Sequence, residues 1–382
     1  MKKILTVVGA RPQFVKCAAV SQVLRTQLEE VLVHTGQHYD YSMSDIFFEE
    51  LSIPKPKYHL GVGSGKHGAQ TGEMLAKLEE VIMDERPHAV MVYGDTNSTL
   101  AAALAASKYY IPVIHIEAGL RSFNRQMPEE INRVLTDHVS SLLLCPTETA
   151  VNNLRREGFG NMVDAANFFH DDKVVFCSPE HPIVANVGDV MYDMIRIVKD
   201  SFSEEYRGET LKKFGVEHKK FAIATIHRAE NTNSLSALRS IINALSHIGR
   251  EFPVLLPLHP RTRGIIDREQ IEIPASLVIM EPQGYKDMIL LQESASIVLT
   301  DSGGMQKEAF LLRTPCITMR EQTEWLETVE CGWNMLTGAQ EEEIIGAFRR
   351  MDEMVLPPQL QPFGDSYAGA KITDAILQYI ES

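Results

Sequence analysis

Short apolar runs alternate with longer amphipathic segments along most of this chain, and this alternation constrains its fold more than any other feature. Segments 13–30 and 72–85 carry apolar residues at helical spacing, and the runs between such segments are almost continuously apolar. Strands of this kind are typical of a parallel sheet that helices cover on both faces. The expected strands are KILTVVG (3–9), EVLVHTG (30–36), AVMVYGD (89–95), VIHIEAG (113–119) and SLLLCPT (141–147).

The alternation stops once and then resumes, which predicts two domains. Residues 159–186 are polar and irregular and contain two prolines. A chain of 382 residues also suits two domains better than one. We therefore expect two α/β domains with a boundary near residue 187, and the pattern allows the last helix, from Gly369, to belong to either. The expected strands of the second half are KFAIATIHR (220–228), FPVLLPLHP (252–260), SLVIMEP (276–282), SASIVLTDSGG (294–304) and TPCITMR (314–320).

The composition argues against several classes of function. A formal net charge of −14 disfavours nucleic acid as a partner, because a phosphate backbone requires a basic face. The five cysteines are odd in number and lack CxxC spacing, which disfavours a disulfide framework and a cysteine metal site. The apolar start ends at Gly9 and is interpreted as a first strand, and no run approaches the roughly 20 apolar residues that cross a bilayer. We expect a soluble, cytoplasmic protein with no membrane partner.

Charged and hydrogen-bonding residues gather where the expected strands end. Ligands of open α/β sheets bind beyond the carboxyl ends of the strands, so this set predicts a binding site in a cleft. Any one member, taken alone, is explained equally well as a cap, a turn residue or a solvated tip. The set comprises Arg11, Lys16, Gln37, His38, Asp95, Glu117, Arg121, His227, Arg228, His259, Arg261, Glu281, Ser302, Gly303, Gly304 and Arg320.

The stretch LTDSGGMQKEAF (299–310) indicates a ligand class. An apolar run stops at a serine and two glycines, and a helical pattern follows. Unpaired backbone N–H groups and the positive end of a helix dipole would meet there, which suits a phosphate. Ser302 as a plain N-cap explains the same pattern. Glu308, one to two turns into the helix, would either accept hydrogen bonds from ribose hydroxyls or face solvent.

Two kinds of group stand out among these candidates and together favour a sugar nucleotide. The basic residues and the 302–304 turn suit a diphosphate, whereas the carboxylates Asp95, Glu117, Glu129 and Glu130 suit proton transfer. No GxGxxG follows the first strand, so nicotinamide binding is not indicated. The histidines show no metal-ligand spacing, so we expect neither a metal nor a cofactor.

Six segments resemble the non-hydrolysing UDP-N-acetylglucosamine 2-epimerases, in order and over nearly the whole chain. They are GARPQFVK (9–16), GDTNSTLA (94–101), HIEAGLRSFNRQMPEEINRVLTDH (115–138), HRAEN (227–231), HPRTR (259–263) and TDSGGMQKEA (300–309). The resemblance implies two Rossmann-like domains facing across a cleft, as in GT-B glycosyltransferases. It also implies a C-terminal helix that returns to the N-terminal domain, and thus domains of 1–186 plus 367–382 and of 187–366.

The resemblance implies inversion at C2 of a UDP-sugar without a redox cofactor. UDP leaves C1 while the C2 proton is removed, which gives a bound glycal, and UDP adds back after proton delivery to the other face. Carboxylates would stabilise the oxocarbenium-like state and move the proton, and cationic groups would stabilise the departing diphosphate. Which carboxylate removes the proton and which returns it is left open. The family also implies a homodimer.

Matched to the family motifs position by position, the chain supplies a full set of site residues. The resemblance makes Asp95, Glu117, Glu129 and His227 catalytic. It makes Arg11, Lys16, Arg121, His259, Arg261, Ser302, Gly303, Gly304, Glu308 and Arg320 contacts of the substrate or its UDP part.

Three departures from the family pattern bear on specificity and regulation. Trp325, in QTEWLE, stands where many members have the arginine of TERPE, so a cationic contact is lost and a large flat group is gained. With RSFNRQMPEE, this segment resembles a branch that acts on UDP-2,3-diacetamido-2,3-dideoxy-glucuronate, so this sugar and UDP-N-acetylglucosamine remain alternatives. Tyr39 and Asp40 replace an arginine and a glutamine of substrate-activated members, which argues against an allosteric UDP-sugar site. Segment 159–186 is longer than usual in the family and has no assigned role.

Three other functions share part of this pattern. A hydrolysing 2-epimerase would release free UDP, and a GT-B glycosyltransferase would pass the sugar to an acceptor. A non-catalytic UDP-sugar sensor would lack one of the three carboxylates Asp95, Glu117 and Glu129, and all three are present. That carboxylate set favours proton transfer at the sugar over delivery to an acceptor.

Overall fold

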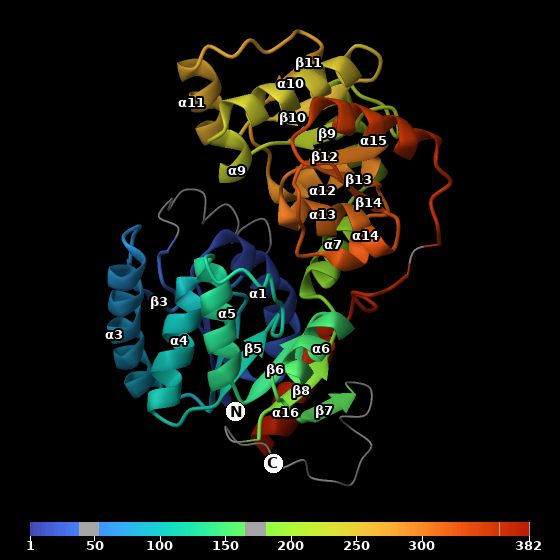
Figure 1. The fold of residues 1–382 in the computed structure, drawn as a ribbon. Coiled ribbons are helices and arrows are strands. Elements are labelled where there is room, and N and C mark those ends of the chain that lie inside the picture. Colours follow the sequence, from blue (N-terminus) through green and yellow to red (C-terminus); the bar gives the residue numbers. More distant parts are fainter. Residues whose placement is uncertain (38–52, 165–180, 359, 382) are drawn as a thin grey trace. The chain divides into compact units, whose positions relative to one another are not determined.

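The computed structural model describes residues 1–37, 53–164, 181–358 and 360–381. The chain forms two compact units, residues 1–196 with 361–382 and residues 197–360 (Figure 1). Each unit contains its own parallel sheet with helices, which confirms the expected pair of Rossmann-like folds. The domain limits derived from the sequence, 1–186 plus 367–382 and 187–366, stay a prediction.

The sheet of unit 1 has eight strands in the order β3-β2-β1-β4-β5-β6-β8-β7, and every neighbouring pair is parallel. The order reverses between β1 and β4, so the turns that follow these two strands leave the sheet at a topological switch point. The strands are β1 Lys3–Val8, β2 Glu29–His34, β3 Tyr58–His59, β4 Ala89–Tyr93, β5 Val113–Ile116, β6 Leu142–Cys145, β7 Asn161–Asp164 and β8 Ile183–Asn186.

Segment 159–186, expected to be irregular, contributes two of these strands. β7 and β8 pair with each other, and β8 also pairs with β6, so both extend the sheet of unit 1. The expectation of an irregular segment was wrong at these two places, because β7 (NMVD) has only two consecutive apolar residues and β8 (IVAN) only three.

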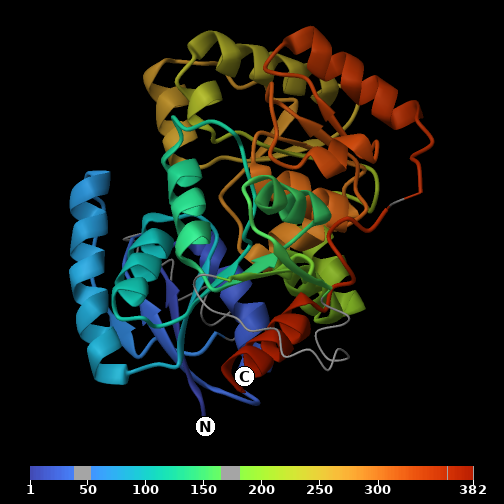
Figure 2. The ribbon, with the colours of Figure 1, turned by 60° about the horizontal axis from the view of Figure 1, so that its bottom comes forward.

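Helices pack on both faces of the unit 1 sheet. Leu5 and Val7 of β1 share a buried cluster with α3 and α4, and the residues between them point to the opposite face. There α16, in red, lies along α1, in dark blue (Figure 2). The helices are α1 Arg11–Leu24, α3 His67–Glu85, α4 Asn97–Lys108, α5 Pro128–Val139, α6 Glu148–Arg156 and α16 Ala368–Glu381, and α7 Val190–Asp200 carries the boundary between the units.

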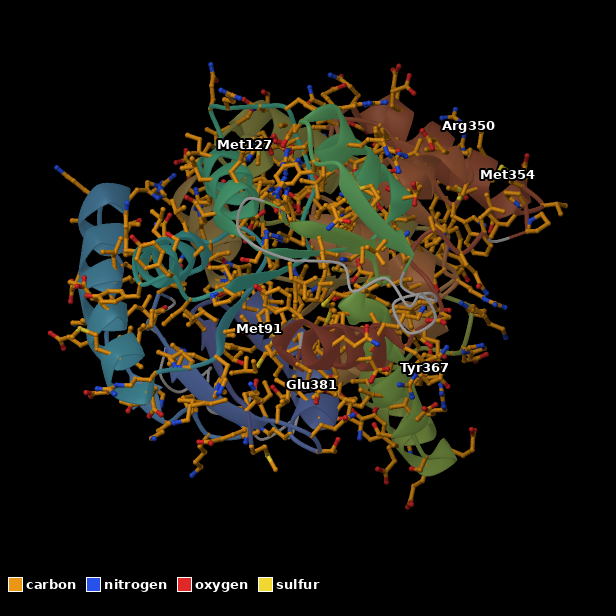
Figure 3. All side chains as sticks on the ribbon, turned by 90° about the horizontal axis from the view of Figure 1, so that it is seen from below. Met91, Met127, Arg350, Met354, Tyr367 and Glu381 are labelled. Carbon is orange, nitrogen blue, oxygen red and sulfur yellow. The ribbon has the colours of Figure 1, made fainter. Side chains whose placement is uncertain are left out.

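The C-terminal helix is fixed to unit 1 at its first turn, which confirms its expected return to the N-terminal domain. Both carboxylate oxygens of Asp193, on α7, accept hydrogen bonds, from the backbone N–H of Ala368 at 2.9 Å and of Gly369 at 2.7 Å. The guanidinium of Arg196 lies 4.7 Å from the ring centroid of Tyr367, which directly precedes the helix. Figure 3 labels Tyr367 and Glu381 near the two ends of α16.

The sheet of unit 2 repeats the same plan with six parallel strands in the order β11-β10-β9-β12-β13-β14. Its switch point lies between β9 and β12. The strands are β9 Ala222–Thr225, β10 Val254–Pro257, β11 Leu277–Met280, β12 Ile297–Thr300, β13 Cys316–Thr318 and β14 Asn334–Leu336.

Strand residues of unit 2 alternate between two buried clusters, as expected for a sheet covered on both faces. Ile297 and Leu299 of β12 pack with α10 and α15, whereas Val298 packs with α12 and α13. The helices are α8 Glu204–Phe214, α9 Ala229–Thr232, α10 Leu235–Gly249, α11 Pro260–Arg268, α12 Tyr285–Ser294, α13 Gly303–Leu311, α14 Leu326–Glu330 and α15 Glu341–Glu353.

Some expectations from the sequence concern residues outside the described part of the chain. His38, Tyr39, Asp40 and the 165–180 portion of segment 159–186 lie there, so the predictions about them stay predictions. Within the described ranges, every helix is too short or too polar to cross a lipid bilayer.

Candidate active site

Gln13 joins the two turns at the switch point of unit 1. Its side-chain oxygen accepts from the backbone N–H of Gly9 at 2.8 Å and of Ala10 at 3.0 Å, at the start of α1. Its side-chain nitrogen donates to the carbonyl oxygen of Tyr93 at 2.8 Å, at the end of β4. Gln13 is buried, and its hydrogen bonds hold the β1–α1 and β4–α4 turns at a fixed position relative to each other. Gln13 was not among the residues predicted from the strand ends, although it lies inside the GARPQFVK motif.

Lys16 and Glu117 form an ion pair beside the end of β4. The two side chains are 12% and 11% exposed. A Cβ atom on Gly94 would lie 3.2 Å from Oε2 of Glu117 and 3.6 Å from Nζ of Lys16, and Gly94 has φ +61°. Glycine adopts this φ without strain, and a larger residue would crowd Glu117, so the backbone before Asp95 lies close to this pair.

Asp95 forms an ion pair with Arg133, which the sequence analysis missed. Nη1 of Arg133 also donates to Glu130 at 3.2 Å. Burial lowers the pKa of Arg133, but the charges of Asp95, Glu130 and Glu117 outweigh it, so the pKa is raised overall. Arg133 lies four residues after Glu129 on α5, one helical turn along, and that spacing was the signal available in the sequence.

Glu129 and Glu130 are neighbours on α5 with different surroundings. Glu130 is buried and accepts hydrogen bonds from the backbone N–H of Ser122 at 2.9 Å and of Phe123 at 3.0 Å, so it holds the loop before the helix. Glu129 is exposed and has no hydrogen bond or ion pair with the described residues. Glu130 therefore has a structural role, whereas the carboxylate of Glu129 is available to a ligand. The catalytic role of Glu129 stays a prediction.

A buried hydrogen-bond network centred on Asp137 supports the turns that follow β4 and β5. Nδ1 of His115 lies 2.6 Å from Oδ1 of Asp137, and Nε2 lies 2.7 Å from the carbonyl oxygen of Gly94. Burial raises the pKa of Asp137, but His115 and Arg121 outweigh it and lower the pKa overall, so the carboxylate is ionised. The imidazole thus lies between the Asp137 carboxylate and a backbone carbonyl oxygen. This ring fixes the carbonyl group that precedes Asp95.

Arg121 belongs to the same network. Its side chain is 1% exposed, and it donates to Asp137 at 2.7 Å and to both carboxylate oxygens of Glu157 at 2.6 and 2.7 Å. Its guanidinium thus donates to protein groups in this structure, and the predicted contact between Arg121 and UDP stays a prediction. Arg11 is the first residue of α1, and the placement of its side chain lies outside what is described.

Asp301 joins the two turns at the switch point of unit 2. It is fully buried and accepts hydrogen bonds at 3.1 Å from the backbone N–H of His227, the backbone N–H of Arg228 and the side-chain amide of Asn231. The loop after β9 is thereby fixed to the loop after β12. The serine and glycines of TDSGG were predicted site residues, but this aspartate was not, because its role depends on a partner about 70 residues away.

His227 lies among cationic groups. Burial lowers its pKa, and the charges of Arg228, His259 and Arg320 lower it further against the opposing charge of Asp301. The side chain is 40% exposed. The imidazole is therefore mainly neutral near pH 7, and it borders a region that attracts negative charge.

The start of α13 presents donors that the described residues do not use. Ser302 is the N-cap, and its hydroxyl accepts from the backbone N–H of Met305 at 3.4 Å. The N–H groups of Gly303 and Gly304 have no hydrogen-bond partner among the described residues. Within that same part of the chain, Nε of Arg228 is buried and has no partner either. The capping role and the phosphate role expected for this turn are thus compatible.

The remaining predicted ligand contacts in unit 2 also have protein partners. His259 caps α11 by accepting from the backbone N–H of Arg261 at 3.2 Å. Oε2 of Glu308 accepts from the amide of Gln292 at 2.9 Å. Arg320 donates to Glu230 at 2.6 Å. Ligand contacts for these residues stay predictions.

The described residues contain no group of three or more histidine, cysteine or acidic side chains that could hold a metal ion.

The ring of Trp325 is buried. It is 6% exposed, and the ammonium of Lys307, on α13, lies 4.1 Å from its ring centroid. The family arginine expected near this position is thus replaced by a tryptophan that carries a lysine over its face. A cation is therefore still present at this place, supplied by another element.

Comparison with known proteins identifies the family of this chain. Residues 22–377 match the family model described as UDP-N-acetylglucosamine 2-epimerase. A UDP-2,3-diacetamido-2,3-dideoxy-D-glucuronate 2-epimerase from Pseudomonas aeruginosa is 47% identical over 99% of both chains. The crystal structure of the Methanocaldococcus jannaschii UDP-GlcNAc 2-epimerase, in complex with UDP-GlcNAc and UDP, is similar with a TM-score of 0.83 and 38% identity over 99% of both chains. A Neisseria meningitidis UDP-GlcNAc 2-epimerase bound to UDP-GlcNAc gives a TM-score of 0.84 and 28% identity, over 98% of this chain and all of the other. The chain therefore belongs to the UDP-N-acetylglucosamine 2-epimerase family, whose members are isomerases.

Proposed function

We propose that this protein is a non-hydrolysing 2-epimerase of a UDP-2-acetamido sugar, of the UDP-GlcNAc to UDP-ManNAc type. The observation that carries the proposal is the arrangement of carboxylates in a chain of this family. Asp95 follows β4 at the switch point of unit 1, and Glu117 follows the neighbouring strand β5. Each is held by its own cation, Arg133 and Lys16 respectively. Paired carboxylates at fixed positions suit stereospecific proton transfer.

The proposed reaction has two balanced halves. In the first, the C1–O bond breaks with its electron pair remaining on UDP, and the C2–H proton passes to a carboxylate, so that a C1=C2 double bond forms. In the second, a proton reaches the opposite face of C2, and a β-phosphate oxygen of UDP forms the new C1–O bond. Asp95, Glu117 and Glu129 are the proposed carboxylates. Their assignment as base or acid is open.

The proposed UDP contacts lie on unit 2. The free N–H groups of Gly303 and Gly304, with Arg228 and His227, suit the diphosphate, since donors and cations at a helix N-terminus stabilise a leaving anion. Glu308, one turn along α13, is the proposed ribose contact. Arg11, Lys16, His259, Arg261, Ser302 and Arg320 remain proposed contacts of the substrate.

Sequence identity does not separate two candidate substrates of this chemistry. The relative named for UDP-2,3-diacetamido-2,3-dideoxy-D-glucuronate is 47% identical, and a relative from Methanococcus maripaludis named as a UDP-N-acetylglucosamine 2-epimerase homolog is 46% identical. The buried Trp325 beside Lys307 does not decide between the sugars, because its ring is covered. We keep the diacetamido-uronate as the alternative substrate of the same chemistry.

Proton NMR in D₂O tests the proposal with both UDP-sugars in parallel. We expect deuterium at C2 and a manno-configured UDP-sugar, with no accumulation of UDP. Free UDP with free sugar would instead identify a hydrolysing 2-epimerase. Transfer that occurs only with an added acceptor would identify a glycosyltransferase. Absence of C2 exchange with both sugars would refute the proposal.

Asp95→Asn gives a sharper test of the residue roles. The amide keeps the size of the side chain but cannot take a proton, so we expect kcat to fall by at least about 100-fold. UDP binding, which we place on unit 2, should stay within about twofold. Asp84→Asn, at an exposed position on α3, is the matched control and should retain full activity. Wild-type turnover by Asp95→Asn would remove Asp95 from the mechanism.

The proposal includes two further expectations, about the oligomeric state and the cellular location. The family resemblance implies a homodimer, and the cytoplasmic location is the expectation drawn from the sequence itself. Light scattering coupled to size-exclusion chromatography measures the first, and cell fractionation measures the second.

A further inference from the structure

The carboxylate of Glu324 occupies the N-terminal end of α13. A Cβ atom on Gly303 would lie 2.1 Å from Oε1 of Glu324 and 3.1 Å from its Cδ, so the carboxyl group rests against the first residue of the helix. A side chain at residue 303 would have to displace it. Gly303 thus makes room for an anion at the positive end of the helix, and in this structure that anion is Glu324.

Two arginines share this carboxylate. Nη1 of Arg320 lies 3.1 Å from Oε2 of Glu324, and Nη2 of Arg228 lies 3.7 Å from Oε1. The Glu324 side chain is 27% exposed. The same Nη2 of Arg228 would lie 3.4 Å from a Cβ on Gly303, so the arginine, the helix start and the carboxylate meet at one place.

The backbone on both sides of Glu324 is anchored, which leaves its side chain as the part that can move. The hydroxyl of Thr323 donates to Gln306 of α13 at 2.6 Å and accepts from the backbone N–H of Trp325 at 3.1 Å. Trp325 itself is buried against Lys307. Rotation about the side-chain bonds of Glu324 would therefore free the helix start without unfolding the loop.

We infer that Glu324 is an internal competitor of the nucleotide diphosphate, which must be displaced when UDP binds and which returns when UDP leaves. The inference rests on the proposed function, because it assumes a diphosphate at the start of α13. Two anions at one helix N-terminus repel each other, and both would require the same arginine donors. Glu324 therefore weakens UDP binding and offers Arg228 and Arg320 a partner during release.

This role suits a reaction that separates UDP from the sugar and then rejoins them. UDP must be held through the glycal stage but must leave with the product once per turnover. A carboxylate that competes for the same donors lowers the barrier to release, because Arg228 exchanges one anion for another instead of being left unpaired, whereas Arg320 keeps Glu230 as a second partner.

Isothermal titration of UDP into the wild-type protein and Glu324→Gln, at one ionic strength, tests the inference. The amide keeps the size of the side chain and removes its charge. We expect the Kd for UDP to fall by about 5- to 20-fold and the dissociation rate to fall with it. Glu321→Gln, an equal charge change at an exposed position on the same loop, is the matched control and should change the Kd by less than about twofold.

The possible outcomes separate the inference from the proposed function. An unchanged or weaker affinity in Glu324→Gln would mean that Glu324 orients the arginines, and the inference would be wrong while UDP binding stands. Failure of the wild-type and both variants to bind UDP would refute the proposed function and the inference with it. Glu324→Ala, checked by thermal melting, provides a second variant should Glu324→Gln fold poorly, and a tighter Kd is expected there as well.

Discussion

At the scale of single residues, the carboxylates of unit 1 differ in how they are held. Glu117 is paired with Lys16 and Asp95 with Arg133, whereas Glu130 is buried in the hydrogen bonds of a loop. Arg133 also contacts Glu130, so one guanidinium connects the loop before α5 with the turn after β4. The position of Asp95 therefore depends on a residue that the strand-end argument did not select.

Arg133→Met should separate catalysis from nucleotide binding. The methionine keeps much of the volume but removes the partner that fixes the carboxylate of Asp95. A misplacement of about 1 Å at a reacting group costs about 100-fold, so we expect kcat to fall by that order. The Kd for UDP, measured by titration, should stay within about twofold. Arg155→Met, at an exposed position on α6, is the control, and a matching loss of activity there would mean that the effect is general.

The sequence revealed most site residues that stand at strand ends, but it missed Asp301, which directly follows β12, and other residues that act through distant partners. Asp95, Glu117, His227 and the 302–304 turn follow strands directly, so position alone pointed to them. Gln13, Asp301 and Glu324 matter because they contact segments about 20 to 80 residues away. Their residue types are common in turns, so no local pattern distinguishes a bridging role from an ordinary cap.

At the scale of elements, the central strands of both sheets could be predicted, whereas the edge strands β3 and β14 could not. β1, β4, β9 and β12 lie inside the expected runs, because central parallel strands are apolar on both faces. β3, with two residues, and β14, with three, lie at sheet edges, where little apolar sequence is needed. Such strands are held by neighbouring side chains rather than by their own pattern.

Glu85 is one such neighbour, and it fixes the end of α3 to two strands of unit 1. Its carboxylate accepts from the ammonium of Lys3 at 2.8 Å, from that of Lys57 at 2.5 Å and from the hydroxyl of Tyr58 at 2.6 Å. These three donors, with Lys3 the largest contributor, lower the pKa of Glu85 from 4.5 to about 2. Because the folded pKa lies below the unfolded one, the contribution to stability is present above pH 4.5 and is lost as the pH falls toward 2.

Glu85→Gln should accordingly lower the free energy of unfolding by about 2 kcal/mol at pH 7. The difference from the wild type should shrink by about half at pH 3, where the unfolded wild-type chain already binds the proton. Urea unfolding at the two pH values measures both quantities. Glu80→Gln, at an exposed position on the same helix, should change the free energy of unfolding by less than about 0.5 kcal/mol at either pH. A pH-independent effect of Glu85→Gln would contradict the assigned pairing.

At the scale of the whole molecule, the chain begins and ends in the same unit. α16 follows unit 2 in the sequence but packs along α1, and Gly369 allows close approach there, since a Cβ would lie 3.1 Å from the carbonyl oxygen of Ala19. Ile372 and Ile376, one helical turn apart on α16, are fully buried. The C-terminal helix should therefore contribute its stability to unit 1.

Hydrogen exchange after Ile376→Ala tests whether the two units respond separately. Loss of a buried isoleucine costs about 2 to 5 kcal/mol, so amides in α1 and β1 should exchange faster than in the wild type. Amides in β9 and β12 should keep their wild-type rates. Ile344→Ala, at an equally buried position on α15, is the matched variant and should give the opposite pattern, with faster exchange in unit 2 alone. Equal acceleration of both units by either substitution would show that the chain unfolds as one cooperative body, and α16 would then stabilise the molecule as a whole.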